Sequence, residues 1–430
     1  MQVIYQRCCG RDVHKKVIAA CVLLCEERGR KRKELRTFGT MTRDLLALAD
    51  WLQGLGVEQV AMESTGVYWK PVWNILEGQL ELLLVNAQQI KAVPGRKTGI
   101  QDCEWIADLL QHGLLRRSFV PEPAIRELRD VTRYRATLAQ ERATVANRIQ
   151  KVLEDANMKL ASVATDVLGQ SGRSMWEAMV AGQQDPEQLA ELARRRLRAK
   201  IPQLRAALPG RIQEHHRFLL RRLVEHLRFV ESPIAELEEE MERRRGPFQE
   251  AVSRWTTIPG VEKIVAWSLV AEIGTRMEQF PSAQHLASWA GVCPGNHESA
   301  GKRRRGTTRR GNPWLRRVLC QAAGPASRTR GRYLSAPFHR RAARRGRKRA
   351  IIAVAHSLLV IAYGLLRQQC DYRELGGNSF DRLHAEGLKR HLLRRLTRLG
   401  YKATLEPPES STQMNFQGSS LTSPGIPLAD

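Results

Sequence analysis

The chain has 430 residues, 42% of them hydrophobic, which is enough to bury the cores of two or three domains. Its 70 Lys and Arg residues outnumber 44 Asp and Glu residues, and the formal charge of +26 favours a polyanionic partner such as nucleic acid. The longest apolar run, residues 351–366, carries His356 and is short for a membrane span. The residues that follow Met1 do not have the pattern of a secretory signal peptide. We therefore expect a soluble, cytoplasmic protein with no membrane partner.

The cysteines and histidines show no metal-binding spacing. There is no C-x-x-C pair and no His pair at zinc spacing, so we expect reduced thiols and no structural zinc. Gly295 and Gly301 have five residues between them, one more than a phosphate-cradling loop has, and Arg303 stands where that loop needs Ser or Thr. ATP use is therefore unsupported.

The first 115 residues alternate apolar runs of strand length with amphipathic segments. The runs predict strands at residues 3–5, 17–24, 35–38, 59–64 and 80–86. The amphipathic segments predict helices at residues 41–56, 67–76 and 100–115. Strands that alternate with helices indicate an α/β sheet with covered faces.

The middle of the chain is predicted to be helical. One apolar stripe keeps alternating steps of three and four, with Arg135 and Arg142 in its two gaps, and consists of Leu128, Val131, Leu138, Val145, Ile149 and Val152. A second stripe consists of Ile212, Leu219, Leu223, Leu227, Val230, Ile234, Leu237 and Met241. Such heptads form either an antiparallel hairpin within one chain or an intermolecular coiled coil, so a plain spacer and a dimerisation element are both open.

Two local patterns interrupt this helical region. Ser232 followed by Pro233 predicts a helix restart, with the serine as N-cap and the proline in the first turn. An Arg-rich connection, residues 194–211, is broken by Pro202 and Pro209 and separates the two stripes.

A third unit begins near Trp255. Residues 257–274 partly resemble a helix-hairpin-helix element, although an ordinary helix turn explains them equally well. Residues 299–370 contain no Asp or Glu, and eighteen Lys or Arg residues fall within 302–349. Ser299 stands at the head of this basic segment, where a hydroxyl could act on a phosphate or simply contact it.

Three carboxylates are predicted to lie at the ends of α/β elements. Asp12 is expected just after the first strand, Glu63 at the end of a central strand, and Asp102 at the start of a helix. Carboxylate oxygens at such positions are suitable ligands for one or two Mg²⁺ ions. Each residue also has a plain alternative: a turn former, an exposed strand end, and a favourable charge at a helix N-terminus.

These residues sit in motifs that resemble a known family. The segments GRDVHKK around Asp12, AMESTGVYW around Glu63 and residues 94–115 around Asp102 resemble the amino-terminal half of the insertion-sequence 110 transposases, also called Piv/MooV-like or DEDD transposases. NHESAGKRRRGTTRRGNPWLRRVL (296–319) resembles their carboxy-terminal motif. The similarity runs in matching order over residues 3–405.

The resemblance implies a fold that combines α/β and all-α parts. Residues 1–118 would form a RuvC-like, ribonuclease-H-type catalytic domain, and residues 119–250 a long helical coiled-coil region. Residues 251–406 would form a small, mainly helical transposase domain that bears a serine nucleophile. The tail, residues 407–430, is rich in Ser, Pro and Gly and is expected to be disordered.

The resemblance also implies a chemistry. Asp12, Glu63 and Asp102 match three of the family's four acidic Mg²⁺ ligands, and Ser299 matches the serine that attacks a DNA phosphate. The neighbouring cations would bind nucleic acid: Lys302, Arg303, Arg304, Arg305, Arg309, Arg310, Arg316 and Arg317. The implied partners are target and donor DNA and a structured non-coding bridge RNA. The active site would be shared between subunits of a homo-oligomer, a dimer or a dimer of dimers, in the bacterial cytoplasm near the nucleoid.

The chain departs from the family pattern in one important place. The family's helix carries a D-x-x-D pair, but Gly99 stands where the first aspartate is expected, and Asp108 would be rotated about 120° from Asp102. Arg11 also stands where the family usually has an apolar residue. Water could fill the missing ligand position. Two other functions therefore stay open: a metal-dependent junction-resolving nuclease without serine chemistry, and a decayed protein that only binds nucleic acid.

Overall fold

The computed structural model describes residues 2–25, 31–63, 66–86, 90, 102–294, 298–299, 302–303, 308, 311–379, 382 and 385–404. The chain divides into two compact units. Unit 1 consists of Met1–Ser253, Lys263–Leu286 and Leu366–Gln368, and unit 2 of Arg254–Glu262, Ala287–Leu365 and Gln369–Asp430. The predicted disordered tail, residues 407–430, lies outside the described residues.

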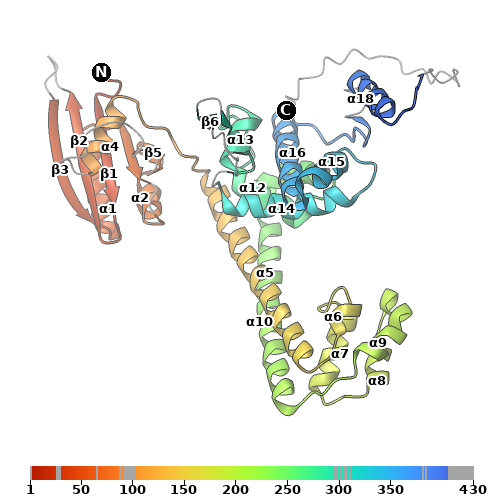
Figure 1. The fold of residues 1–430 in the computed structure, drawn as a ribbon. Helices are drawn as coiled ribbons and strands as arrows, with labels where there is room; N and C mark the ends of the chain where they lie inside the picture. Colours follow the sequence, from red (N-terminus) through yellow and green to blue (C-terminus); the bar gives the residue numbers. More distant parts are fainter. Residues whose placement is uncertain are drawn as a thin grey trace. The chain divides into compact units, whose positions relative to one another are not determined.

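Unit 1 begins with a five-stranded sheet, which confirms the predicted α/β character of this part of the chain (Figure 1). The strands lie in the order β3-β2-β1-β4-β5. Strand β2 is antiparallel to both β1 and β3, whereas β4 is parallel to β1, and β5 is parallel to β4. Their bounds are β1 (Arg7–Val13), β2 (Val17–Cys25), β3 (Lys31–Gly39), β4 (Gln59–Glu63) and β5 (Glu81–Val85).

Helices cover both faces of the sheet. On one face α1 (Thr42–Gly54) and α2 (Trp69–Leu76) pack Leu48 and Trp73 into a core with Cys9 and Val22. On the other face α4 (Asp102–Gln111) packs Cys103 and its neighbours against Cys8 and Ala61. Successive residues of a strand point to opposite faces, so Cys8 and Cys9 serve the two different cores.

The first strand was predicted in the wrong place. It covers Arg7–Val13 and not residues 3–5, because its buried positions are filled by two cysteines, a glycine and an arginine that hydropathy does not identify as core. The third strand is also longer than predicted and begins at Lys31. Its charged side chains are mostly exposed, as is suitable for the edge of a sheet.

A close approach at Gly10 fixes α4 against β1. A Cβ atom on Gly10 would lie 2.2 Å from the backbone nitrogen of Ala107 and 2.3 Å from the carbonyl oxygen of Cys103. No side chain fits there, so only glycine allows the helix backbone to rest directly on the strand. This contact sets the depth and height of α4 on the sheet.

The two apolar stripes form α5 (Pro123–Asp155) and α10 (Glu214–Arg243), which pack antiparallel as a hairpin within one chain (Figure 1). The arginines that fill the gaps of the first stripe reach across the hairpin. Arg135 Nη2 lies 2.7 Å from Glu238, and Arg142 Nε lies 2.7 Å from Glu231. Of the two alternatives left by the sequence, the structure contains the hairpin within the chain, and intermolecular pairing stays a prediction.

Two details of α10 differ from the prediction. The helix runs unbroken through Pro233, so the predicted restart at Ser232 is wrong. Proline costs the helix one backbone hydrogen bond, and the ion pairs to α5 on either side of it hold the helix together. The buried residues near its start are Leu220 and Val224 instead of Leu219, because inserted helices offer a second packing partner on that side.

The insert between α5 and α10 is compact. It consists of α6 (Leu160–Val163), α7 (Gln170–Val180), α8 (Pro186–Glu191), the 3-10 helix η2 (Arg195–Lys200) and α9 (Ile201–Ala207). Trp176 is fully buried at its centre and donates its indole N–H to the carbonyl of Val167 at 3.1 Å. The Arg-rich connection, residues 194–211, is therefore largely helical.

A buried ion pair joins α5 to α12 (Lys263–Ile273), which follows α11 (Gln249–Thr256). Arg133 binds both carboxylate oxygens of Glu272, at 2.7 and 2.9 Å, and Glu272 is only 2% exposed. Arg129 donates to the backbone carbonyls of Ala271 and Glu272 at 2.9 and 2.8 Å. Burial lowers the pKa of Arg129 to about 10.

The rest of the described chain is mainly helical, with a short two-stranded hairpin. Its elements are α13 (Ala283–Trp289), β6 (Glu298–Ser299), β7 (Lys302–Arg303), α14 (Pro313–Arg328), α15 (Ser335–Arg345), α16 (Arg347–Gln368) and α18 (Ala385–Arg398). By length and composition alone α16 could cross a membrane, because the helix has 22 residues and its most apolar 18-residue window has a mean hydropathy of 1.9. Of its most apolar window, 44% is buried inside the protein.

Candidate active site

Asp12 and Glu63 lie side by side on the sheet. Arg11 of β1 is in register with Met62 of β4, and continuing this parallel register by one residue pairs Asp12 with Glu63. Cys8 and Ala61, which precede them by an even number of residues, face α4. Both carboxylates are therefore on the α4 face of the sheet.

Asp102 is the first residue of α4, as predicted, and the helix N-terminus favours its negative charge. The pKa of Asp12 is raised, first by burial and then by the negative charges of Asp102 and Glu63, while His14 opposes the shift. The structure therefore brings Asp102 and Glu63 within electrostatic reach of Asp12. Asp12 itself lies inside β1, and its prediction as a residue after the strand was wrong for the same reason that β1 was misplaced.

His14 is a member of this acidic cluster that sequence reasoning missed. Its Nε2 lies 3.0 Å from Oδ2 of Asp12, and its side chain is largely exposed. The available signal was the spacing, because residues two apart on a strand share a face. This contact lowers the pKa of Asp12 and so partly opposes the effect of burial.

The cluster suits a divalent cation. Three carboxylates supply the hard oxygen atoms that Mg²⁺ and Mn²⁺ prefer. Burial is the main cause of the raised pKa of Asp12, and the repulsion from Asp102 and Glu63 adds to it. A bound cation would relieve this repulsion. Gly99, where the family pattern has a fourth carboxylate, lies outside the described residues.

Arg11 lies on the opposite face of β1 and is fully buried in the core under α1 and α2. Burial lowers its pKa, and the nearby Cys9 thiol, a weak acceptor, opposes that shift. None of its guanidinium nitrogens reaches a described partner at hydrogen-bond distance and angle. The arginine that departs from the family pattern is thus a buried charge next to the strand that carries Asp12.

Ser299 lies in unit 2, on the short hairpin. Its strand β6 is antiparallel to β7, with Ser299 in register with Lys302 and Glu298 with Arg303. Pro294, which precedes this hairpin, forms an antiparallel β-bridge with Thr308, which follows it. Arg304, Arg305, Arg309 and Arg310 lie outside the described residues.

The remaining predicted cations, Arg316 and Arg317, are on the first turns of α14. Gly311 permits the entry to this helix, because a Cβ atom there would lie 2.3 Å from the backbone nitrogen of Gly291. Asn312 caps the helix by accepting bonds from the N–H groups of Trp314 and Leu315 at 3.0 and 3.2 Å. The motif GNPW therefore fixes the start of α14.

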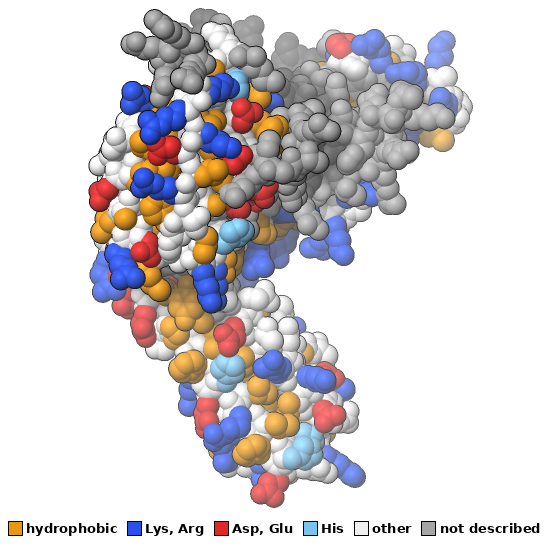
Figure 2. Space-filling view, turned by 90° about the vertical axis from the view of Figure 1, so that its left-hand side faces the viewer, with side chains coloured by type: hydrophobic (Ala, Val, Ile, Leu, Met, Phe, Trp, Pro, Cys, Tyr) orange, Lys and Arg blue, Asp and Glu red, His pale blue; other side chains and the backbone are white. Residues whose placement is uncertain are grey.

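The basic side chains on the face shown in Figure 2 are spread out. The guanidinium of Arg317 lies 5.5 Å from the Trp314 ring, so it is held by the helix while its charge stays exposed. On the face shown in Figure 2, Lys and Arg side chains are scattered among Asp and Glu instead of forming one stripe. The described side chains on that face do not delimit a nucleic-acid track by themselves.

Two family models match the chain. The DEDD transposase model of IS110 elements matches residues 9–158, and a model described as the transposase IS116/IS110/IS902 family matches residues 252–339. The transposase for insertion sequence element IS1111A of Coxiella burnetii is 24% identical over 301 residues, which are 67% of this chain and 72% of that protein. The pilin gene-inverting protein of Moraxella bovis is 36% identical over 117 residues, which are 26% of this chain and 35% of that protein.

Proposed function

Because this chain belongs to the IS110 family of transposases, we propose that it mobilises an insertion sequence under RNA guidance through a covalent phosphoserine intermediate at Ser299. Membership makes the chain a DNA transposase or recombinase, and the Moraxella relative is named for inverting a gene. The observation that carries the proposal is the convergence of Asp12, Glu63 and Asp102 on one face of the sheet.

We assign a RuvC-like catalytic role to residues 1–118, a coiled-coil role to 119–250 and the serine domain to 251–406. The strand order β3-β2-β1-β4-β5, with one antiparallel half and one parallel half, supports a ribonuclease-H-type sheet. The carboxylates at the ends of β1 and β4 and at the start of α4 support metal binding there. Divalent ions, when bound, would neutralise charge that develops on the phosphate.

The serine step needs both units. The hydroxyl oxygen of Ser299 loses its proton and forms a bond to phosphorus, a backbone P–O bond breaks, and the departing strand oxygen gains one proton, so the exchange is balanced. The energy of the broken bond is kept in the phosphoserine, so the reverse exchange rejoins strands without ATP. Ser299 belongs to unit 2 and the acidic cluster to unit 1, which is compatible with a site shared between subunits of a homo-oligomer.

The partners follow from this chemistry. We propose that target and donor DNA are bound together with a structured bridge RNA, in the cytoplasm near the nucleoid. The net charge of +26 supports a large nucleic-acid surface. If the basic segment neutralises about 6–10 phosphates, the affinity should fall roughly 10³–10⁵-fold between 50 and 200 mM salt.

A trapping experiment tests the serine. The protein is mixed with its element DNA, guide RNA and Mg²⁺, and the denatured products are separated to detect DNA attached to protein. We expect an adduct with the wild type, none with Ser299→Ala, and an unchanged adduct with Ser288→Ala, which alters an exposed serine in unit 2. Cleavage by Ser299→Ala with no adduct in any protein would replace the proposal with a metal-only nuclease.

A further inference from the structure

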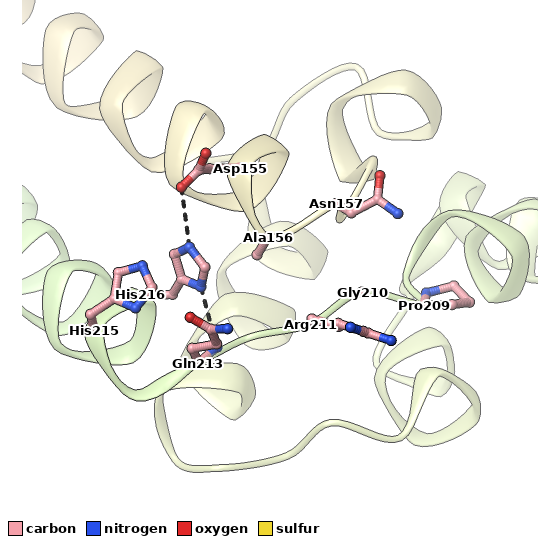
Figure 3. A pocket seen from close by; sticks show the side chains of 9 residues that line it. All are labelled: Asp155, Ala156, Asn157, Pro209, Gly210, Arg211, Gln213, His215 and His216. Atoms are coloured by element: carbon pink, nitrogen blue, oxygen red, sulfur yellow. Dashed lines mark hydrogen bonds and ion pairs between the residues drawn. The ribbon is translucent and has the colours of Figure 1, made fainter.

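One group of metal-ligating side chains lies outside the acidic cluster, where the inserted helices begin and end. Asp155 is the last residue of α5, and His215 and His216 are in the first turn of α10 (Figure 3). One ligand atom from each lies within 4.8 Å of the other two. We propose that these three residues bind a transition-metal ion of the Zn²⁺ class, which joins the two ends of the insert.

The donor set selects the class of ion. Two imidazole nitrogens and one carboxylate oxygen suit Zn²⁺, whereas Mg²⁺ prefers oxygen ligands alone. Nε2 of His216 lies 3.2 Å from Oδ2 of Asp155. Two ligands of a tetrahedral zinc ion, with bonds of about 2.0–2.1 Å, stand about 3.3 Å apart. This pair therefore already has the separation of one edge of the tetrahedron.

The surroundings allow the other ligands to adjust. His216 is buried and fixed, whereas the Asp155 side chain is 74% exposed and His215 is also exposed. The imidazole rings of His215 and His216 have their centroids 3.8 Å apart. All three residues line an open pocket with Gly210 and Arg211, so water can complete the coordination (Figure 3).

Metal binding has a definite cost at His216. Its Nδ1 accepts a hydrogen bond from the backbone N–H of Gln213 at 3.2 Å, so the ring proton is on Nε2, pointing to Asp155. An ion on Nε2 moves this proton to Nδ1 and ends the bond from Gln213. The other half of the capping box, from the His216 N–H to the Gln213 side chain, remains. We therefore expect reversible binding, weaker than in a closed structural zinc site.

The ion would reinforce a junction that the backbone already makes. The N–H of Arg211 donates to the carbonyl of Ala156 at 2.9 Å, and the N–H of Lys159 donates to the carbonyl of Ala207 at 2.8 Å. Both bonds join the start of the insert to its end. A metal link beside them would stabilise the insert on the hairpin, and this inference is independent of the proposed recombination chemistry.

Zinc binding by the full-length protein tests the inference. The number of tightly bound Zn²⁺ equivalents and their affinity are measured by competition with a chromophoric chelator, for the wild type, His215→Ala and Asp155→Asn. The matched control is His226→Ala, because His226 is a half-buried histidine of α10 paired with Glu141 at 3.0 Å. These variants keep the acidic cluster and every cysteine, so zinc that binds elsewhere contributes equally to each protein and does not affect the differences between them. His216 is left unchanged because it caps α10.

We expect His215→Ala and Asp155→Asn each to lose one equivalent, or to bind it at least tenfold more weakly, while His226→Ala binds like the wild type. Zn²⁺ should also slow hydrogen exchange in the insert of the wild type and of His226→Ala only. Equal zinc binding by all four proteins would overturn the inference. So would a response to Mg²⁺ at this junction equal to the response to Zn²⁺, because the donor set would then be irrelevant.

Discussion

Replacing Gly10 with alanine tests how the fold positions the acidic cluster. The added methyl would meet backbone atoms of α4 at 2.2 and 2.3 Å, so the helix must move outward by roughly 1 Å to reach ordinary contact. Overpacking of this kind costs about 1–3 kcal/mol. Because Asp102 begins α4, it moves with the helix, and a misplacement of this size can lower activity about 10²-fold.

Hydrogen exchange and adduct formation measure the two effects separately. In Gly10→Ala we expect faster exchange in β1 and α4, by the factor that corresponds to about 1–3 kcal/mol, and about 10²-fold slower adduct formation. Gly54→Ala is the matched control, because no atom lies within 4 Å of a Cβ there and alanine favours the helix. Wild-type protection of β1 and α4 in Gly10→Ala would refute the account of this contact.

Three further substitutions test individual side chains by their effect on the free energy of unfolding. The pKa of Asp12 is raised in the folded state, so the free energy of unfolding falls as the pH rises through that pKa. Asp12→Asn should therefore stabilise the metal-free protein at pH 7, and Mg²⁺ should stabilise the wild type more than this variant. A metal-free Asp12→Asn protein that is less stable than the wild type would contradict the direction of the shift. Arg11→Leu should gain about 1–3 kcal/mol by removing unsatisfied buried donors, and a loss would mean that Arg11 has a partner. Glu272→Gln should lower the free energy of unfolding by about 3 kcal/mol, because Arg133 loses its buried carboxylate partner. Glu177→Gln, in an exposed ion pair, should lower it by under about 1 kcal/mol. Similar losses in the two variants would refute the importance of burial.

Local patterning determined much of the fold from the sequence alone. The stripes of α5 and α10, the end of β4 at Glu63 and the start of α4 at Asp102 follow from periodicity and end signals. Glu63 and Asp102 could be named for the same reason, since each stands at the end of an element, whereas Asp12 lies inside β1 and was expected after a misplaced strand. Intermolecular pairing of the hairpin and the role of Ser299 stay predictions.

Tertiary packing decided the rest. Whether β1 begins at residue 3 or at Arg7 depends on burying cysteines and an arginine, and only the two helical layers make those positions interior. The closeness of Asp102 to Asp12 depends on the absence of a side chain at Gly10, and local propensity does not reveal what rests on a glycine. Asp155 and His216 are far apart in sequence and meet because the insert returns to the hairpin where it left. Contacts of this kind depend on how the chain folds back on itself, which periodicity does not encode.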